Sequence, residues 1–161
     1  MEISATWQTD PGGGYTDFLD VACVGDQVYA LSTDGLYSGN PEISDLSYFA
    51  NWTRLSPGRY GSECKLLAAS ASSLFVYKDQ SSLNDSLLRI TNTASTAVAI
   101  GDLSGQSLRY AEGGISLSAG STIQTFTTEG YPALLIDSYG WGIPNANDAV
   151  YEHGTLWIAD G

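Results

Sequence analysis

The chain has 161 residues, which is enough for one domain with a buried core, and its 43% hydrophobic content is too high for a disordered chain. Only 15% of the residues are charged, whereas Gly (18) and Tyr (10) are abundant, so the composition argues against a helical bundle and favours short strands with polar turns. The 18 acidic residues against 6 basic ones give a net charge of -12, which opposes binding to phosphates and predicts no nucleic-acid partner.

The first unit of strands is predicted between residues 18 and 55. It is preceded by an alternating stretch at residues 3–9, which predicts a half-buried strand, and by a Pro- and Gly-containing break at residues 10–14. The unit itself has four stretches separated by turn residues, which predicts four antiparallel strands joined by hairpins. The predicted strands are Phe18–Val24, Gln27–Ser32, Gly35–Ser38 and Asn51–Leu55. The first is apolar enough for an inner strand, and the last is polar enough for an exposed edge.

A second unit is predicted at residues 64–100 and a third at residues 101–128. The strands predicted for the second unit are Lys65–Ser70, Leu74–Lys78, Leu87–Thr91 and Thr96–Ile100. Those predicted for the third unit are Ser107–Ala111, Gly114–Ser118 and Thr122–Thr127. The inner strand of the third unit is either residues 101–106 or residues 96–100, and the pattern leaves both alternatives open.

The C-terminal part contains a strand, a loop and an incomplete fourth unit. Ala133–Asp137 is apolar and is predicted to be a buried strand, and a Gly-, Pro- and Asn-containing loop follows it. The fourth unit is predicted at residues 147–161. No stretch shows sustained helical periodicity and no linker indicates a second domain, so residues 1–161 are predicted to form a single all-β segment.

The units are copies of one repeat. Asp20 aligns with Asp148, Val28–Ala30 aligns with Leu156–Ile158, and weaker copies place Leu74–Val76 and Leu108–Tyr110 at the same point, in steps of 46, 34 and 48 residues. Repeats of roughly 40 to 50 residues made of short strands are typical of β-propeller blades. The sequence therefore predicts about three and a half four-stranded antiparallel blades that belong to a larger ring, and an isolated chain that self-associates.

Ten apolar residues occupy equivalent positions in these units and are predicted to be buried: Val21, Cys23, Val28, Ala30, Leu67, Ala69, Leu74, Val76, Leu156 and Ile158. Cys23 and Cys64 are offset by about five residues, or roughly 16 Å along equivalent strands, whereas a disulfide needs Cα atoms within about 7 Å. We therefore expect two buried free thiols.

The blade sequences resemble a bacterial propeller group. The residues that carry the resemblance are Trp7, Tyr15, Phe18–Val21, Asp26–Leu31, Asp34–Leu36 and Gly154–Ala159. They are similar to the blades of the PorZ component of the type IX secretion system and of the sensor propellers of Bacteroidetes two-component regulators. The resemblance implies a periplasmic or cell-surface β-propeller that works as a scaffold or sensor. The second and third units depart from the family pattern, because the Gly-Leu third strand is missing or is replaced by Gly114-Ile115.

The N-terminus contains neither the basic region nor the apolar core of a signal peptide. No stretch approaches the roughly 20 apolar residues of a membrane span. We therefore expect no insertion into a membrane. The resemblance implies an exported protein, and its signal peptide is not present in this sequence.

No arrangement of residues predicts catalysis. Ser32–Gly35 resembles a sialidase Asp box but has the wrong spacing, so a hairpin turn is expected there, and Asp102–Gln106 matches a quinoprotein repeat equally poorly. His153 is the only histidine and falls in a predicted turn, where a solvated residue is expected instead of a metal ligand or a base. We predict no catalytic residue, no metal site and no cofactor.

Loop aromatics are the strongest binding candidates, because such rings stack on sugars or anchor partner proteins. The candidates are Tyr131, Tyr139, Trp141, Tyr48 and Trp52, and the alternative is that they fold back to cover the blades. Asp85-Ser86-Leu87 also resembles the O-glycosylation site of exported Bacteroidetes proteins, with Ser86 as the acceptor.

Three hypotheses of function follow. The first is a non-enzymatic, exported β-propeller segment that serves as a protein-interaction or sensor scaffold at the bacterial cell envelope, with a protein or the remaining blades as its partner. The second is a carbohydrate-binding surface module that uses Trp141 and Tyr139. An enzyme of the sialidase or quinoprotein type is the least favoured.

Overall fold

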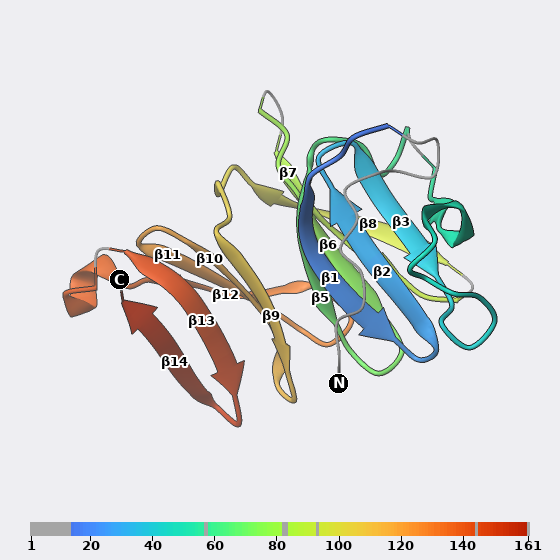
Figure 1. Cartoon of the computed structure of the whole chain (residues 1–161). Helices are drawn as coiled ribbons and strands as arrows, with labels where there is room; N and C mark the ends of the chain where they lie inside the picture. The colour runs from blue at the N-terminus through green and yellow to red at the C-terminus, as the bar shows by residue number, and fades with distance from the viewer. Residues whose placement is uncertain (1–13, 57, 82–83, 93, 144, 161) are drawn as a thin grey trace.

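The computed structural model describes residues 14–56, 58–81, 84–92, 94–143 and 145–160. Within these ranges the chain forms fourteen strands and two short 3-10 helices (Figure 1). The strand predicted at residues 3–9 lies outside the described residues. No helix in the described ranges has the length and apolar character needed to cross a membrane.

The strands form three four-stranded antiparallel sheets and one two-stranded sheet, so the protein is all-β, and the sheets are consistent with partial propeller blades. Sheet 1 contains β1 (Phe18–Val24), β2 (Gln27–Ser32), β3 (Gly35–Gly39) and β4 (Thr53–Arg54). Sheet 2 contains β5 (Cys64–Ala69), β6 (Leu74–Lys78), β7 (Asp85–Ile90) and β8 (Ser95–Gly101). Sheet 3 contains β9 (Ser107–Ala111), β10 (Gly114–Ala119), β11 (Thr122–Phe126) and β12 (Pro132–Asp137). Sheet 4 contains β13 (Ala146–Glu152) and β14 (Thr155–Asp160).

Each sheet repeats the same chain path, because strands that follow one another in the chain are neighbours in the sheet, which gives the order β1-β2-β3-β4 and its equivalents. The first strands of sheets 1, 2 and 4 also share a bulge, which falls between Phe18 and Asp20, between Cys64 and Leu66, and between Ala146 and Asp148. A bulge at the same place in three sheets fixes their residues in a common register. The repeat seen in the sequence is therefore a repeat of register as well as of strand order.

This register gives the repeat a more regular spacing than the sequence alignment did. Val28, Leu74, Ile115 and Leu156 occupy the same place in the second strand of their sheets, and the steps between them are 46, 41 and 41 residues. The alignment of Leu108–Tyr110 with that position was wrong, since these residues lie in β9, the first strand of sheet 3. The error arose because adjacent strands of a blade have similar apolar patterns.

The boundaries of the third unit consequently need correction. Its strands run from 107 to 137 and not from 101 to 128, and its inner strand is β9. Both of the alternatives considered for that strand are wrong, because residues 96–100 belong to β8 and residues 102–106 link β8 to β9. β12, predicted to be buried, is the outer strand of sheet 3, and its Leu135 is 66% exposed. An apolar run alone does not reveal whether another sheet covers it.

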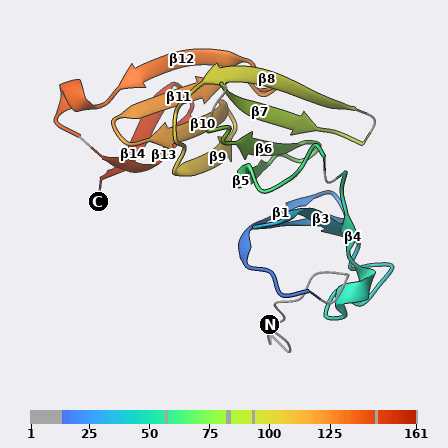
Figure 2. The same cartoon turned by 90° about the horizontal axis from the view of Figure 1, so that it is seen from above.

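The sheets pack face to face in chain order, with a separate apolar core between each pair. The first core joins Leu31 and Leu36 of sheet 1 to Leu67, Leu74 and Val76 of sheet 2. The next core packs residues of sheet 2, such as Phe75 and Tyr77, against sheet 3. A smaller core joins Ile123 of sheet 3 to Ala146 and Ala149 of sheet 4. Sheet 1 and sheet 4 therefore lie at opposite ends of the molecule (Figures 1 and 2).

Every sheet has two faces, which we name by chain order. The upstream face points toward the preceding sheet, and the downstream face points toward the following one. In sheet 2, Leu67, Leu74 and Val76 form the upstream face in the first core, and Phe75 and Tyr77 form the downstream face in the second. The shared register places Val21, Cys23, Val28 and Ala30 on the upstream face of sheet 1, and Val150, Trp157 and Ala159 on the downstream face of sheet 4.

The ten residues predicted to be buried all lie on upstream faces, but only some of them are buried. Leu67, Leu74 and Val76 are buried, whereas Val21 is 63% exposed. Cys23 is exposed as well, so the prediction of two buried free thiols is confirmed only for Cys64. Of the other five, Ala30 is buried and four are half-buried: Val28, Ala69, Leu156 and Ile158.

Candidate docking face

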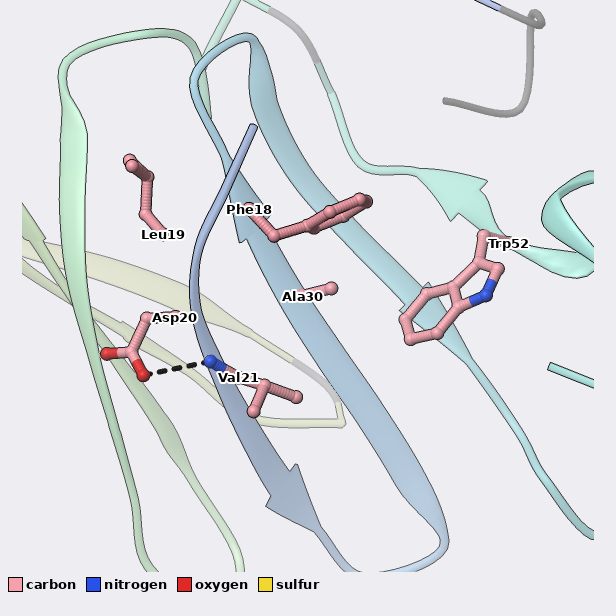
Figure 3. A pocket seen from close by; sticks show the side chains of 6 residues that line it. All are labelled: Phe18, Leu19, Asp20, Val21, Ala30 and Trp52. Carbon is pink, nitrogen blue, oxygen red and sulfur yellow. Dashed lines mark hydrogen bonds between the residues drawn. The ribbon is translucent and has the colours of Figure 1, made fainter. Parts of the chain in front are cut away.

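The upstream face of sheet 1 contains an open apolar pocket with a volume of about 470 Å³ (Figure 3). Its lining residues come from β1, β2 and the segment before β4, and they are Phe18, Leu19, Asp20, Val21, Ala30 and Trp52. Val21 and Leu19 are exposed, while Ala30 and Trp52 are buried and form the floor. The pocket can therefore accept an apolar or aromatic group, and burying exposed apolar surface stabilises a complex by roughly 25 cal/mol per Å².

The bulge in β1 positions Asp20, the one carboxylate among the described residues that line this pocket. Asp20 Oδ1 accepts a hydrogen bond of 2.8 Å from the backbone N–H of Val21, and Oδ2 accepts one of 2.9 Å from the N–H of Leu67 in sheet 2. Figure 3 shows Asp20 and Trp52 on opposite sides of β1. Asp20 thus joins sheet 1 to sheet 2 and leaves the rest of the pocket apolar.

The floor of the pocket depends on Trp52, a candidate binding aromatic that folds back onto the blade, the alternative considered for it, and is only 8% exposed. Its ring packs in a small core with Ala30 and Tyr37, and its Nε1 donates a hydrogen bond of 3.0 Å to the carbonyl of Leu46. Because the indole N–H has a partner, the ring can face the pocket without an unsatisfied polar group. Gly39 permits this packing, since a Cβ there would lie 2.5 Å from the Leu46 side chain.

A second pocket of about 240 Å³ lies at the other end of the molecule, on sheet 4. Its lining residues are Asp148, Ala149, Val150, Trp157, Ile158 and Ala159. Trp157 is 65% exposed, although its equivalents Tyr29 and Phe75 pack against the following sheet. Sheet 4 therefore presents a downstream face of the same kind that sheets 1 and 2 use for packing.

The other predicted binding residues do not form one site. Tyr139 and Trp141 lie together in η2 (Tyr139–Trp141) and are exposed. Tyr131 precedes β12 and Tyr139 follows it, so the six residues of that strand separate them by roughly 20 Å. Tyr48 is exposed beside η1 (Phe49–Asn51) of sheet 1, where its ring lies 5.1 Å from that of Phe49.

Ser86 lies in β7, a central strand of sheet 2, and it is half-buried. Its neighbour Asp85 is buried and accepts hydrogen bonds from the Tyr77 hydroxyl at 2.6 Å and from the N–H groups of Gln80 and Leu103 at 2.9 Å. Burial acts to raise the pKa of Asp85, but these hydrogen bonds outweigh it and lower the pKa below its ordinary value. Asp85 is thus a structural residue that ties sheet 2 to the segment before sheet 3.

The hairpin turn expected at Ser32–Gly35, the sequence that resembles an Asp box, is present: Thr33 and Asp34 form the turn, and Ser32 pairs with Gly35 across it. The Asp34 carboxylate accepts hydrogen bonds from Ser32, from Tyr37 at 2.7 Å and from Thr16 at 3.0 Å. Burial acts to raise the pKa of Asp34, whereas these bonds and the nearby Arg54 guanidinium lower it more strongly. Asp34 therefore stabilises sheet 1 as an ionised carboxylate.

His153 lies in the β13–β14 turn, as expected. Its φ of 49° and that of Gly154, 77°, are both positive, which is the geometry of a type I′ hairpin turn. Its Nε2 lies 3.0 Å from a carboxylate oxygen of Glu112 in the β9–β10 turn, and both side chains are exposed. Asp102–Gln106 forms the link between β8 and β9, where Leu103 N–H bonds to Asp85.

Of the residues that line the pocket of sheet 1, Val21 and Ala30 were predicted to belong to the core, and Trp52 was predicted as a binding residue. A blade face is apolar both when a neighbouring sheet covers it and when it is open, so residues such as Val21 and Leu19 carry no signal that separates the two cases. Only the packing of the sheets reveals which face is open.

Comparisons with known proteins inform the fold only. No family model matches the chain, and no curated protein matches it. Among solved structures, it is similar to a chain in the Saccharomyces cerevisiae complex of Dbp5 bound to Nup159, Gle1, IP6 and ADP, with a TM-score of 0.51 and 13% identity. The match covers 75% of this chain and 30% of the yeast chain, so this chain spans less than a third of the length of the chain it matches.

Proposed function

We propose that this chain is a non-enzymatic β-propeller segment that acts as a protein-interaction or sensor scaffold, and that the upstream face of sheet 1 is its docking surface. The observation that carries this proposal is the open pocket of about 470 Å³ with the exposed Val21 at its rim. Inside the molecule, the equivalent face of sheet 2 is covered by another sheet, so this kind of surface already binds protein within the chain.

An apolar side chain of a protein partner suits this pocket better than a charged ligand. Asp20, the one carboxylate among the lining residues that the structure describes, already accepts two hydrogen bonds, and the others offer alkyl groups, an indole and a phenyl ring. Binding energy at protein interfaces concentrates in aromatic side chains that enter such desolvated pockets. The fixed floor formed by Trp52 also reduces the entropy lost on binding.

The proposed location is the periplasm or the surface of a bacterial cell. It is supported by the resemblance of residues 26–31, 34–36 and 154–159 to the blades of the PorZ-like and regulator propellers. Fractionation of the native cells with an antibody to the chain tests the location, and recovery in the cytoplasm alone would contradict it.

The docking surface can be tested with the chain's own exposed thiol. Cys23 lies on the upstream face of sheet 1, and Cys64 is buried, so a maleimide photo-crosslinker attaches selectively to Cys23. We expect the labelled chain to crosslink one protein in envelope extracts, and Val21→Glu to abolish the product. The purified partner should then bind the wild-type chain in calorimetry and bind the Val21→Glu variant at least about tenfold more weakly.

The matched control moves the label away from the face. In a Cys23→Ser background, Ser72→Cys places the thiol in the exposed turn between β5 and β6. The same product from both labels, or a product that survives Val21→Glu, would show that the upstream face of sheet 1 is not the docking surface.

A second candidate function is carbohydrate binding through η2. Tyr139 and Trp141 are exposed in one 3-10 turn, where flat apolar rings are able to stack on a sugar. A glycan array tests this candidate: saturable binding that is lost in Trp141→Ala but kept in Trp157→Ala would support it. Equal loss in both variants would contradict it, since Trp157 is comparably exposed but lies on sheet 4.

A further inference from the structure

The two open faces at the ends of the molecule belong to opposite sides of the same repeat. Sheet 1 leaves its upstream face open, with Val21 exposed, and sheet 4 leaves its downstream face open, with Trp157 exposed. Within the chain, a downstream face packs on an upstream face at each contact between successive sheets. The open faces are thus the two halves of a contact that the molecule already makes between its own sheets.

The internal contacts show what each position should meet. Phe75 has the position of Trp157 in the repeat, and its ring stacks on Tyr110 of sheet 3 with the ring centroids 6.2 Å apart. The shared register places Cys23 of sheet 1 at the position of Tyr110. A downstream face with Trp157 would therefore bring its indole next to Cys23 and Val28, at the edge of the pocket in sheet 1.

We propose that a second copy of this chain docks the downstream face of its sheet 4 on the upstream face of sheet 1, so that the chains associate head to tail. Trp157 of one copy then covers Cys23 and Val28 of the other, at the edge of the pocket that Trp52 floors. This inference rests on the proposed docking function of the sheet 1 face, and it names the partner. The contact is heterologous, so successive copies form a closed ring or an open assembly.

The polar groups at both faces are compatible with this contact. Asp20 already accepts hydrogen bonds from the N–H groups of Val21 and Leu67. Asp148 accepts a hydrogen bond of 2.6 Å from the Ser107 hydroxyl and forms an ion pair of 2.9 Å with Arg109. Docking would therefore leave neither Asp20 nor Asp148 buried without a partner. The interface that remains is apolar, with one tryptophan as its central side chain, which is typical of a binding hot spot.

The net charge of the chain gives the association a distinctive dependence on salt. Two copies each carry a formal charge of -12, so they repel each other at low ionic strength. Salt screens that repulsion without weakening apolar contacts. Association should therefore strengthen between about 0.05 M and about 0.5 M NaCl, whereas a complex held by ion pairs would weaken.

The experiment measures the mass of the 161-residue chain by sedimentation across a concentration series. Val21→Glu disables the upstream face of sheet 1, and Trp157→Glu disables the downstream face of sheet 4. Both side chains are exposed, so neither change should disturb folding. We expect the wild-type chain to associate and each variant to weaken association at least about tenfold. A wild-type chain that stays monomeric at about 100 µM, a concentration well above the dissociation constants of specific complexes, would overturn the proposal.

Mixing the two variants tests the head-to-tail geometry directly. Val21→Glu keeps an intact sheet 4 face, and Trp157→Glu keeps an intact sheet 1 face, so an equimolar mixture should form a heterodimer and nothing larger. A mixture that stays monomeric would overturn the proposal. The matched controls are Leu135→Glu on β12 and Trp141→Glu on η2, which place the same charge at comparably exposed apolar sites. Equal loss of association in these controls would also overturn it.

The Cys23 thiol separates this inference from the proposed function. In the head-to-tail complex, the Cys23 thiol should react with a maleimide about tenfold more slowly than in the dissociated variants, because the docked Trp157 covers it. If the chain is monomeric but Cys23 still crosslinks a different protein through an intact Val21, the second copy is the wrong partner and the docking function stands. If neither occurs, both proposals are wrong.

Discussion

Sheets 1 and 2 have the same strand order, the same bulge and the same register, yet their equivalent residues lie in different environments. Val21 of sheet 1 is 63% exposed, whereas Leu67, at the same position in sheet 2, is 3% exposed. The two positions differ in what lies in front of them, because sheet 1 covers Leu67 and no described sheet covers Val21. The comparison shows that burial in this fold belongs to pairs of sheets and not to single sheets.

The contact between sheets 3 and 4 extends the comparison. The first two contacts are formed by large apolar residues, but the third contains a polar group of hydrogen bonds and an ion pair. Ser107 and Arg109 of β9 bind Asp148, and Ser118 donates a hydrogen bond of 3.2 Å to the carbonyl of Asn147. Sheet 4 is therefore positioned by directional bonds as much as by burial of apolar surface.

The largest effect is expected from truncating equivalent apolar residues on the two upstream faces. Leu74→Ala in sheet 2 should lower the free energy of unfolding by about 2 to 5 kcal/mol, because Leu74 is buried and its removal leaves a cavity. Val28→Ala in sheet 1 should cost about 1 kcal/mol or less, since Val28 is only half-buried. Urea unfolding of both variants measures the difference. Equal costs would show that sheet 1 is as well covered as sheet 2.

The two cysteines provide a chemical measure of the same contrast. Cys23 is exposed, while burial raises the pKa of the Cys64 thiol to about 11. Because the thiolate is the reactive form, Cys64 should react with a thiol reagent near pH 8 at least about a hundredfold more slowly than Cys23. Stopped-flow labelling should show one rapidly reacting thiol in the folded protein and two in the protein unfolded by urea. Two fast thiols without urea would mean that the contact between sheets 1 and 2 opens readily.

A carboxylate in each of the two sheets should make stability depend on pH. The pKa values of Asp34 and Asp85 are both lowered in the folded protein, so each stabilises it above the unfolded pKa of about 3.9 and loses that contribution as the pH falls below it. We expect stability to fall below about pH 4. Asp85→Asn should cost about 1 to 3 kcal/mol at pH 7, and Asp34→Asn should cost less because Asp34 is partly exposed. Thermal unfolding between pH 7 and pH 3 checks both, and a variant that keeps the full acid sensitivity would remove that residue from the explanation.

The smallest effect is expected at the contact between sheets 3 and 4. Arg109→Ala removes an ion pair whose side chains are 50% and 35% exposed, so it should cost less than about 1 kcal/mol, and high salt should reduce the cost further. Lys65→Ala serves as an exposed control on sheet 2. A cost above that of Leu74→Ala would show that polar contacts, and not burial, hold the last sheet in place.

The sequence by itself determined the local structure of this protein. The pattern of apolar residues and of turn residues, such as Gly25-Asp26 between β1 and β2, predicted the bounds of β1, β2, β6 and β9 correctly. These features depend on neighbours in the chain, because turn geometry and the two-residue period of a strand are local properties. The repeat was also visible from the sequence, except in sheet 3, where the β9 pattern was taken for that of β10.

The tertiary structure alone decided which apolar surfaces are covered. Val21 and Leu67 have similar sequence contexts, and the exposed β12 is as apolar as a strand of the core. Only the order in which the sheets stack determines which of these surfaces is buried. For the same reason the structure adds a candidate site that the sequence did not predict, the upstream face of sheet 1, where Trp52 forms the floor of a pocket. Burial of an apolar side chain is favourable, but the surface that buries it is supplied by residues far away in the chain or in another chain.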